Sequence, residues 1–169
     1  MPNSTTQLHE PADKKTRWAW LTATFFGAGL LKPGPGTYGS IAALLLWYGA
    51  AHLFHPSISV LAIGTAAAAT IATLIGIPAA TIVARESGRK DPGHVVIDEV
   101  AGQLITLIAL PATPGFALLA LFLFRFFDIA KPWPIRRLEK LPEGTGIMLD
   151  DVAAGLLALA IAQVTIHLR

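Results

Sequence analysis

Long apolar runs separated by short polar connections are the feature that most restricts what this chain can fold into. There are five of them: residues 39–54, 58–84, about 97–110, 115–127 and 152–168. A run of 16 or 17 residues reaches about 25 Å as a helix, slightly short of a hydrocarbon core of about 30 Å. Hydrophobic residues make up 53% of the chain and charged residues 14%, which is too apolar for an ordinary water-soluble domain. The sequence therefore predicts an all-α, polytopic helical membrane protein with about five crossing helices.

A shorter apolar segment, residues 18–31, is predicted to form an N-terminal interfacial or re-entrant helix anchored by Trp18 and Trp20. A cleaved secretory signal is the competing interpretation, but no small-residue cleavage site ends the run and acidic residues precede it. Residues 1–17 are expected to be a polar tail. No linker or repeat divides residues 18–169, so they are expected to form one helical domain.

A second surface segment follows Pro132 and Pro134. A short amphipathic interfacial helix there would direct apolar side chains into the membrane interface and basic side chains toward anionic head groups. The apolar set is Trp133, Ile135, Leu138 and Leu141, and the basic set is Arg136, Arg137 and Lys140.

The basic residues predict the orientation in the membrane. The connections at residues 55–57 and 111–114 carry no Lys or Arg, and they alternate with strongly basic connections. Five crossings therefore place the basic connections on one side, which the positive-inside rule makes cytoplasmic. The residues concerned are Lys14, Lys15, Arg17, Arg85, Arg89, Lys90, Arg125, Lys131, Arg136, Arg137 and Lys140.

The same topology gathers acidic residues that are far apart in the sequence. Acidic residues lie where the chain enters the membrane from the basic side, where it leaves, and where it enters again. The first group is Asp91, Asp98 and Glu99, the second is Asp128, and the third is Asp150 and Asp151. Charges at membrane depth are costly and usually face a protein interior or a watery cavity, so several at one depth indicate a shared site.

Simpler explanations exist for each acidic pair. Asp150 or Asp151 beginning a helix could cap its free amides, and Asp98 with Glu99 could complement a helix dipole. Neighbouring residues also differ by about 100° around a helix, so normally only one of each pair faces a given ligand. On this reasoning Asp98 and Asp151 are the main candidates.

Converging carboxylates would repel one another unless a cation lies among them. Oxygen ligands without Cys or paired His favour Mg²⁺ over Zn²⁺, and Mg²⁺ commonly bridges to substrate phosphate. A single loop histidine, His94, is more often neither a ligand nor a proton carrier. The small net charge of +2, without a patch of basic and aromatic residues, gives no support for a nucleic-acid partner.

Positively charged residues could hold the phosphate. Arg125, Asp128 and Lys131 are spaced i, i+3, i+6 and would lie near one helix face up to Pro132, although Asp128 could merely neutralise its basic neighbours. The loop "LKPGPGTYGS" adds Lys32 and several glycines whose amides could approach a phosphate, but it matches neither of the common phosphate-binding patterns.

Four motifs, "PGTYGS", "VVIDEVAG", "FRFFDIAKPWPI" and "GTGIMLDDVAAG", occur in an order and spacing that resembles the phosphatidylglycerophosphatase A family over about residues 22–165. The resemblance implies a Mg²⁺-dependent, multi-pass enzyme of the bacterial inner membrane with a cytoplasmic active site. Such an enzyme hydrolyses phosphatidylglycerophosphate to phosphatidylglycerol and phosphate on the route to cardiolipin.

Position by position, the resemblance implies specific roles. The catalytic acids are Asp98, Glu99, Asp128, Asp150 and Asp151, of which Asp98, Glu99, Asp150 and Asp151 hold the metal; the substrate phosphate is bound by Lys32, Thr37, Ser40, Arg125 and Lys131. Pro35, Gly36 and Gly39 belong to the same first loop.

The expected mechanism is metal-assisted attack of water on the phosphate monoester. Asp128 is the candidate to provide the proton that the leaving alkoxide needs. A covalent aspartyl-phosphate is the alternative, although the DxDx(T/V) arrangement is missing. Three other functions compete: a phosphatase of another lipid phosphate such as phosphatidic acid, a divalent-cation transporter, and a lipid-binding scaffold. Acids near midspan would favour the transporter, and the scaffold would leave the acidic pairs without a purpose. No oligomeric state is predicted.

Overall fold

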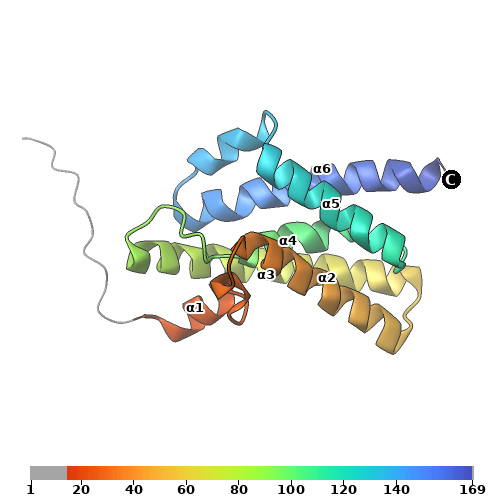
Figure 1. Cartoon of the computed structure of the whole chain (residues 1–169), viewed down its shortest axis with the longest axis horizontal. Helices are drawn as coiled ribbons and strands as arrows, with labels where there is room; N and C mark the ends of the chain where they lie inside the picture. Colours follow the sequence, from red (N-terminus) through yellow and green to blue (C-terminus); the bar gives the residue numbers. More distant parts are fainter. Residues whose placement is uncertain (1–14, 169) are drawn as a thin grey trace, which may run out of the picture.

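The computed structural model describes residues 15–168, and over that range it contains helices and no strand (Figure 1). The all-α prediction is confirmed for these residues. Most of the predicted polar tail, residues 1–14, lies outside the described residues, as does Arg169. The elements are α1 (Arg17–Ala23), the 3₁₀-helix η1 (Ala28–Leu30), α2 (Pro35–Phe54), α3 (Ile58–Ser87), α4 (Ile97–Thr106), α5 (Pro114–Ala130), the 3₁₀-helix η2 (Ile135–Lys140) and α6 (Glu143–His167).

Local sequence signals set the ends of the long helices. The hydroxyl of Ser57 caps α3 by accepting a hydrogen bond from the amide of Val60, and Gly88 ends that helix in the left-handed conformation that glycine adopts freely. Pro114 occupies the first turn of α5, where its missing N–H is not needed. Lys131 ends α5 with φ 41°, immediately before Pro132, which cannot continue a helix.

The predicted number of about five crossing helices is not confirmed. Within residues 15–168, only α3 and α6 are both long enough and apolar enough to cross a membrane. The predicted run at about 97–110 forms only a 10-residue helix, α4, which reaches about 15 Å, half of a hydrocarbon core. Ala109, with φ 58°, interrupts the helical path before Pro111.

The short helix α4 is central in the fold, because α2, α3, α5 and α6 all pack against it (Figure 1). One core cluster on its sides includes Val83, Val100, Ala101 and Met148. The carboxylate-bearing first turn of α4 is therefore enclosed by helices from distant parts of the chain.

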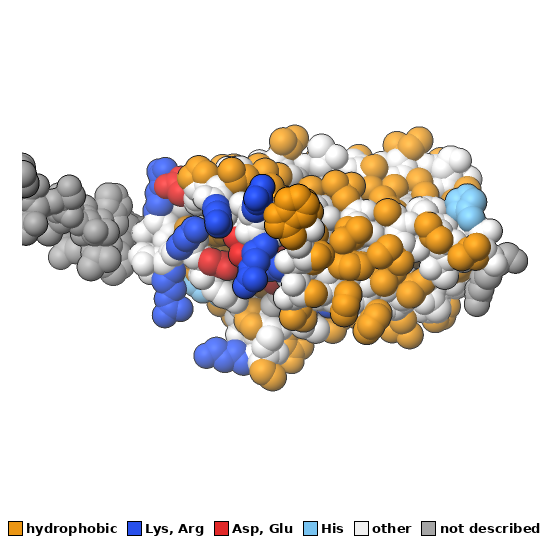
Figure 2. Space-filling view, turned by 90° about the horizontal axis from the view of Figure 1, so that it is seen from above, with side chains coloured by type: hydrophobic (Ala, Val, Ile, Leu, Met, Phe, Trp, Pro, Cys, Tyr) orange, Lys and Arg blue, Asp and Glu red, His pale blue; other side chains and the backbone are white. Residues whose placement is uncertain are grey.

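The two ends of the molecule differ in charge. The α2–α3 connection, the start of α5 and the C-terminal end of α6 lie at one end, whereas η2 and the end of α3 lie at the other (Figure 1). Lys and Arg side chains gather at this second end, and apolar side chains cover most of the rest of the visible face (Figure 2). The predicted return of the basic connections to one end is confirmed.

The two predicted surface segments differ from expectation. Trp18 is exposed, but the indole of Trp20 donates to Glu86 at 2.6 Å, so Trp20 holds α1 to α3 rather than serving as a free anchor. The second segment does form a short helix, the six-residue 3₁₀-helix η2. Trp133 is exposed. Ile135 is buried in a core cluster with Phe124, so the prediction that Ile135 lies in the membrane interface is wrong.

Candidate active site

A glycine contact between α4 and α6 brings the acidic residues together. A Cβ on Gly155 would lie 2.5 Å from the carbonyl oxygen of Gly102, so only glycine allows the helices to approach this closely. The Thr106 hydroxyl donates to the Gly102 carbonyl at 2.9 Å and lies 3.3 Å from the Gly155 carbonyl oxygen. Because Asp98 and Asp151 precede these glycines by four residues, both carboxylates lie one turn away from the crossing.

Three carboxylates converge at this point: Asp98, Glu99 and Asp151 each offer an oxygen within 4.8 Å of the other two. They line a cavity of about 120 Å³, together with Asp128, Lys131 and Asp150. One oxygen of each of the three, Asp98 Oδ1, Glu99 Oε2 and Asp151 Oδ2, is buried without a hydrogen-bond partner among the described residues.

The electrostatics of this group are unfavourable without a cation. Burial, together with the charges of Glu99 and Asp151, raises the pKa of Asp98 well above its ordinary value. Burial also raises the pKa of Glu99. Neither Asp98 nor Asp151 forms an ion pair with a basic residue of the described chain.

The donor set fits a hard divalent cation. Ligand oxygens around one Mg²⁺ lie at most about 4 Å apart, so oxygens within 4.8 Å of one another need only small side-chain movements to share an ion. The three unpartnered oxygens are the ligand atoms that such an ion would satisfy. Both members of the first pair reach the group, so the expectation that only one member of each pair would face the ligand is wrong for Asp98 and Glu99.

Asp150 has different partners. One of its oxygens lies 2.6 Å from Nζ of Lys131, and the other accepts the amide of Asp151 at 3.1 Å. Asp150 was predicted to join the metal set, but these contacts favour a role in holding Lys131. The capping explanation for Asp150 and Asp151 is also wrong, because α6 begins at Glu143 and both residues lie inside it.

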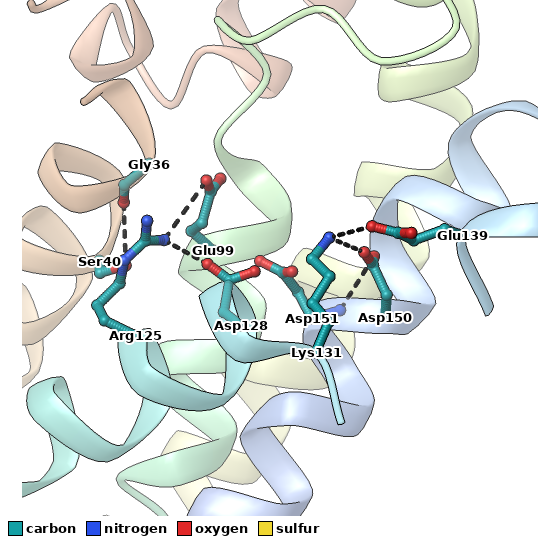
Figure 3. Close-up of polar contacts among 9 residues, drawn as sticks. All are labelled: Gly36, Ser40, Glu99, Arg125, Asp128, Lys131, Glu139, Asp150 and Asp151. Atoms are coloured by element: carbon teal, nitrogen blue, oxygen red, sulfur yellow. Dashed lines mark hydrogen bonds and ion pairs between the residues drawn. The ribbon is translucent and has the colours of Figure 1, made fainter. Parts of the chain in front are cut away.

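Lys131 is held by two carboxylates, since Glu139 of η2 lies 2.7 Å from the same Nζ atom (Figure 3). Burial alone would lower the pKa of Lys131, but the hydrogen bonds to Asp150 and Glu139 outweigh it and raise the pKa above its ordinary value. The hydrogen bond from Lys131 correspondingly lowers the pKa of Glu139. A charged ammonium group is therefore fixed at the edge of the cavity.

Arg125 forms the other cationic side of the site. Its Nη1 lies 2.7 Å from Asp128 and 3.6 Å from Glu99 (Figure 3). The carboxylates of Asp128 and Asp151 point toward each other in the same view. Gly36, in the first turn of α2, packs so closely on Glu99 that a Cβ there would collide with its carboxylate.

The first loop contributes less than predicted. Lys32 and Thr37 are exposed and do not line the cavity. Ser40 is fully buried, and its hydroxyl donates to the carbonyl of Gly36 at 3.0 Å, which closes one turn of α2. The loop contacts the site through Gly36, which packs on Glu99.

One residue near the site, Glu139, was not selected from the sequence, and another, Asp91, was grouped with the acids but given no role. Glu139 looked like one charge in a basic surface segment, and only the turn of η2 back toward Lys131 gives it a role. Asp91, which the predicted topology placed with the other acidic residues, lines the cavity from the α3–α4 connection.

His94 lies beside the site and is held elsewhere. Its ring stacks on Trp20 with the centroids 4.8 Å apart. Burial, with Lys15 and Arg89 nearby, lowers the pKa of His94. His94 is not among the residues that line the cavity, and the expectation that it is not a ligand stays a prediction.

Comparison with known proteins decides the family. The family model described as phosphatidylglycerophosphatase A matches residues 21–166. The chain belongs to this family. The match includes all three members of the carboxylate group, both cations that flank it, and Glu139.

Curated members of the phosphatidylglycerophosphatase A family are similar over most of their length. The Haemophilus influenzae phosphatidylglycerophosphatase A is 41% identical over 143 residues, covering 83% of this chain and 84% of the relative. The Escherichia coli K12 enzyme of the same name is 37% identical over 143 residues, covering 83% and 79%.

A Bacteroides thetaiotaomicron protein, provisionally named a phosphatidylinositol-3-phosphatase, is 37% identical over 147 residues, covering 85% of this chain and 91% of the relative. No solved structure matches the chain significantly.

Proposed function

We propose that this protein is a Mg²⁺-dependent phosphatidylglycerophosphatase, which hydrolyses the terminal phosphate monoester of phosphatidylglycerophosphate and supplies phosphatidylglycerol for cardiolipin synthesis. Family membership supports the reaction, and two family relatives carry the corresponding name. The observation that carries the proposal is the convergence of Asp98, Glu99 and Asp151, with one unpartnered oxygen each, between Arg125 and Lys131.

Asp98, Glu99 and Asp151 would hold Mg²⁺, which neutralises phosphate charge and makes water a better nucleophile when bound. Lys131 lines the cavity, and Arg125 pairs with the cavity residues Glu99 and Asp128. Both cations would bind the non-bridging phosphate oxygens as the charge on these oxygens redistributes. Asp150 and Glu139 keep Lys131 charged and directed toward the cavity.

In the proposed reaction a water oxygen forms a bond to phosphorus while the bond from phosphorus to the glycerol oxygen breaks. The attacking water gives up a proton and the leaving oxygen takes one up. Asp128 is the candidate to accept the first proton and to deliver the second, since it is buried, faces Asp151 and is held by Arg125. Direct attack by water predicts that acid quenching during turnover traps no phosphorylated protein. A trapped aspartyl-phosphate would require the covalent route instead.

We further propose that the enzyme is a multi-pass protein of the bacterial inner membrane, with the carboxylate cavity on the cytoplasmic side. In α3 only 22% of the most apolar 18-residue window is buried, unlike the core helix of a water-soluble protein. Exposed large apolar residues continue along α2, α5 and α6. The basic side chains gather at the end that carries the cavity, as the positive-inside rule requires (Figure 2).

Another lipid phosphate is the second candidate substrate, because one relative of similar identity carries the name of a phosphoinositide phosphatase. The test is phosphate release by the purified protein from phosphatidylglycerophosphate, phosphatidic acid and phosphatidylinositol 3-phosphate, each with and without Mg²⁺. The proposal predicts fastest release from phosphatidylglycerophosphate and none without a divalent cation. Release from none of these lipids, or equal release after chelation, would refute it.

A further inference from the structure

The carboxylate cavity is too small for the whole head group of the proposed substrate. Its volume is about 120 Å³, whereas sites that enclose complete small ligands usually measure about 300–1,000 Å³. Phosphatidylglycerophosphate carries two phosphates, joined through a three-carbon glycerol. If the terminal monoester occupies the cavity, the phosphodiester that leads to the lipid must lie at its mouth.

Two exposed basic residues belong to segments that border the cavity. Lys90 directly precedes Asp91, which lines the cavity from the α3–α4 connection. Arg136 belongs to η2, whose Glu139 contacts the cavity residue Lys131 at 2.7 Å. Figure 2 shows basic side chains around a hollow in which acidic side chains are visible. Two segments that are distant in the sequence therefore carry cations close to residues of the same cavity.

The charges of Lys90 and Arg136 are available to a ligand. Both residues contribute, with Lys131, to lowering the pKa of Glu139, so both act at the same edge of the cavity. Among residues 15–168, neither forms an ion pair, whereas Arg125 and Lys131 are each paired with carboxylates. A cation without a protein partner beside a phosphate site is suited to a second anionic group.

We propose that Lys90 and Arg136 form a subsite for the phosphodiester of the substrate, through which the enzyme prefers a lipid with two phosphates to a lipid with one. The inference rests on the proposed function, and it adds specificity residues outside the carboxylate cavity. The subsite binds one phosphate of the head group, which differs from a general attraction of basic residues to anionic membranes.

The test uses the full-length protein in neutral detergent micelles and a double variant, Lys90→Gln with Arg136→Gln. Loss of charged hydrogen bonds should lower kcat/KM for phosphatidylglycerophosphate by about tenfold or more, mainly through KM. The rate with phosphatidic acid, which has no phosphodiester, should change by less than about twofold. Inhibition by phosphatidylglycerol, which retains only the phosphodiester, should weaken in parallel.

The matched control is Arg137→Gln with Lys140→Gln, which removes the same charge from the same region. Like Lys90 and Arg136, neither residue lines the cavity, but Arg137 lies over the ring of Trp133, 5.2 Å from its centroid. The control should keep the preference for two phosphates. Equal losses in both double variants, or an unchanged preference in Lys90→Gln with Arg136→Gln, would overturn the subsite. A wild-type protein that releases phosphate from none of the lipids would instead overturn the proposed function itself.

Discussion

Gly102 of α4 and Gly155 of α6 are in direct contact, one helical turn beyond Asp98 and Asp151. The parallel spacing on the two helices means that one close crossing fixes the distance between the two carboxylates. A site for a hard cation tolerates little variation in that distance, because Mg²⁺ demands near-ideal geometry at about 2.0–2.1 Å. The glycine pair is therefore part of the site although neither residue carries a functional group.

Gly155→Ala should reduce phosphate release by about tenfold to a hundredfold, because displacement of catalytic groups by about 1 Å can have effects of this size. The new Cβ would lie 2.5 Å from the Gly102 carbonyl oxygen, so the helices must separate. Overpacking of this kind typically destabilises a protein by about 1–3 kcal/mol, and thermal unfolding in detergent should show it.

Gly64→Ala is the control for Gly155→Ala. A Cβ on Gly64 meets no atom within 4 Å, so activity and stability should stay at or above the wild-type level. Wild-type phosphate release by Gly155→Ala would mean that the close crossing does not set the geometry of the site.

The two carboxylates on Lys131 should contribute unequally. The Asp150 side chain is only 5% exposed, whereas that of Glu139 is 43% exposed. An exposed ion pair is worth about 0–1 kcal/mol, so Glu139→Gln should slow phosphate release by no more than about fivefold. Asp150→Asn leaves the half-buried ammonium of Lys131 with only its more exposed carboxylate partner and should slow phosphate release by about tenfold or more.

Glu143→Gln provides the comparison for the Lys131 variants, because Glu143 pairs with Arg85 at the same end of the molecule but does not line the cavity. Steady-state kinetics should rank the three variants with Asp150→Asn slowest and Glu143→Gln nearest to wild type. The reverse order would remove Lys131 and its partners from the proposed mechanism.

His94 should affect pH stability but not catalysis. Because burial lowers its pKa in the folded protein, the unfolded chain binds more protons between the two pKa values. Stability is therefore full above the unfolded pKa of about 6.5 and falls as the pH decreases through it. His94→Phe keeps a ring on Trp20 and removes this titration.

The decline in melting temperature between pH 7.5 and 5.5 should consequently be smaller in His94→Phe than in wild type, with phosphate release at pH 7.5 within about twofold of wild type. An identical decline in both proteins would contradict the buried neutral histidine. A large loss of phosphate release would mean that His94 takes part in catalysis, which the geometry does not suggest.

Sequence reasoning identified the acidic set because charged residues are rare and conspicuous in such an apolar chain. Asp98, Glu99 and Asp151 converge, as expected from the predicted topology, in which the chain returns to the same end of the molecule. The separation of Asp150 from them could not be predicted, because adjacent positions in α6 differ only in rotation around the helix, and that rotation is set by packing against α4 and α5.

The helix boundaries were predicted less well, for a physical reason. An apolar run does not distinguish a helix that crosses a membrane from one enclosed by other helices, and α4 is the second kind. The polar start of α6 at Glu143 was missed because glycines and charges there resemble a loop. The role of Glu139 could not be predicted because it depends on the path of η2. Two prolines set that path, and no periodic pattern in the sequence indicates it.

The most direct test of the carboxylate site is calorimetric titration of the purified protein with Mg²⁺, alongside Asp98→Asn and Asp151→Asn, with Glu143→Gln as the control. The account predicts that wild type and Glu143→Gln bind Mg²⁺ and release phosphate, whereas the two Asn variants stay folded, bind the ion at least about tenfold more weakly and release almost no phosphate. Wild-type Mg²⁺ binding and phosphate release by either Asn variant would contradict it.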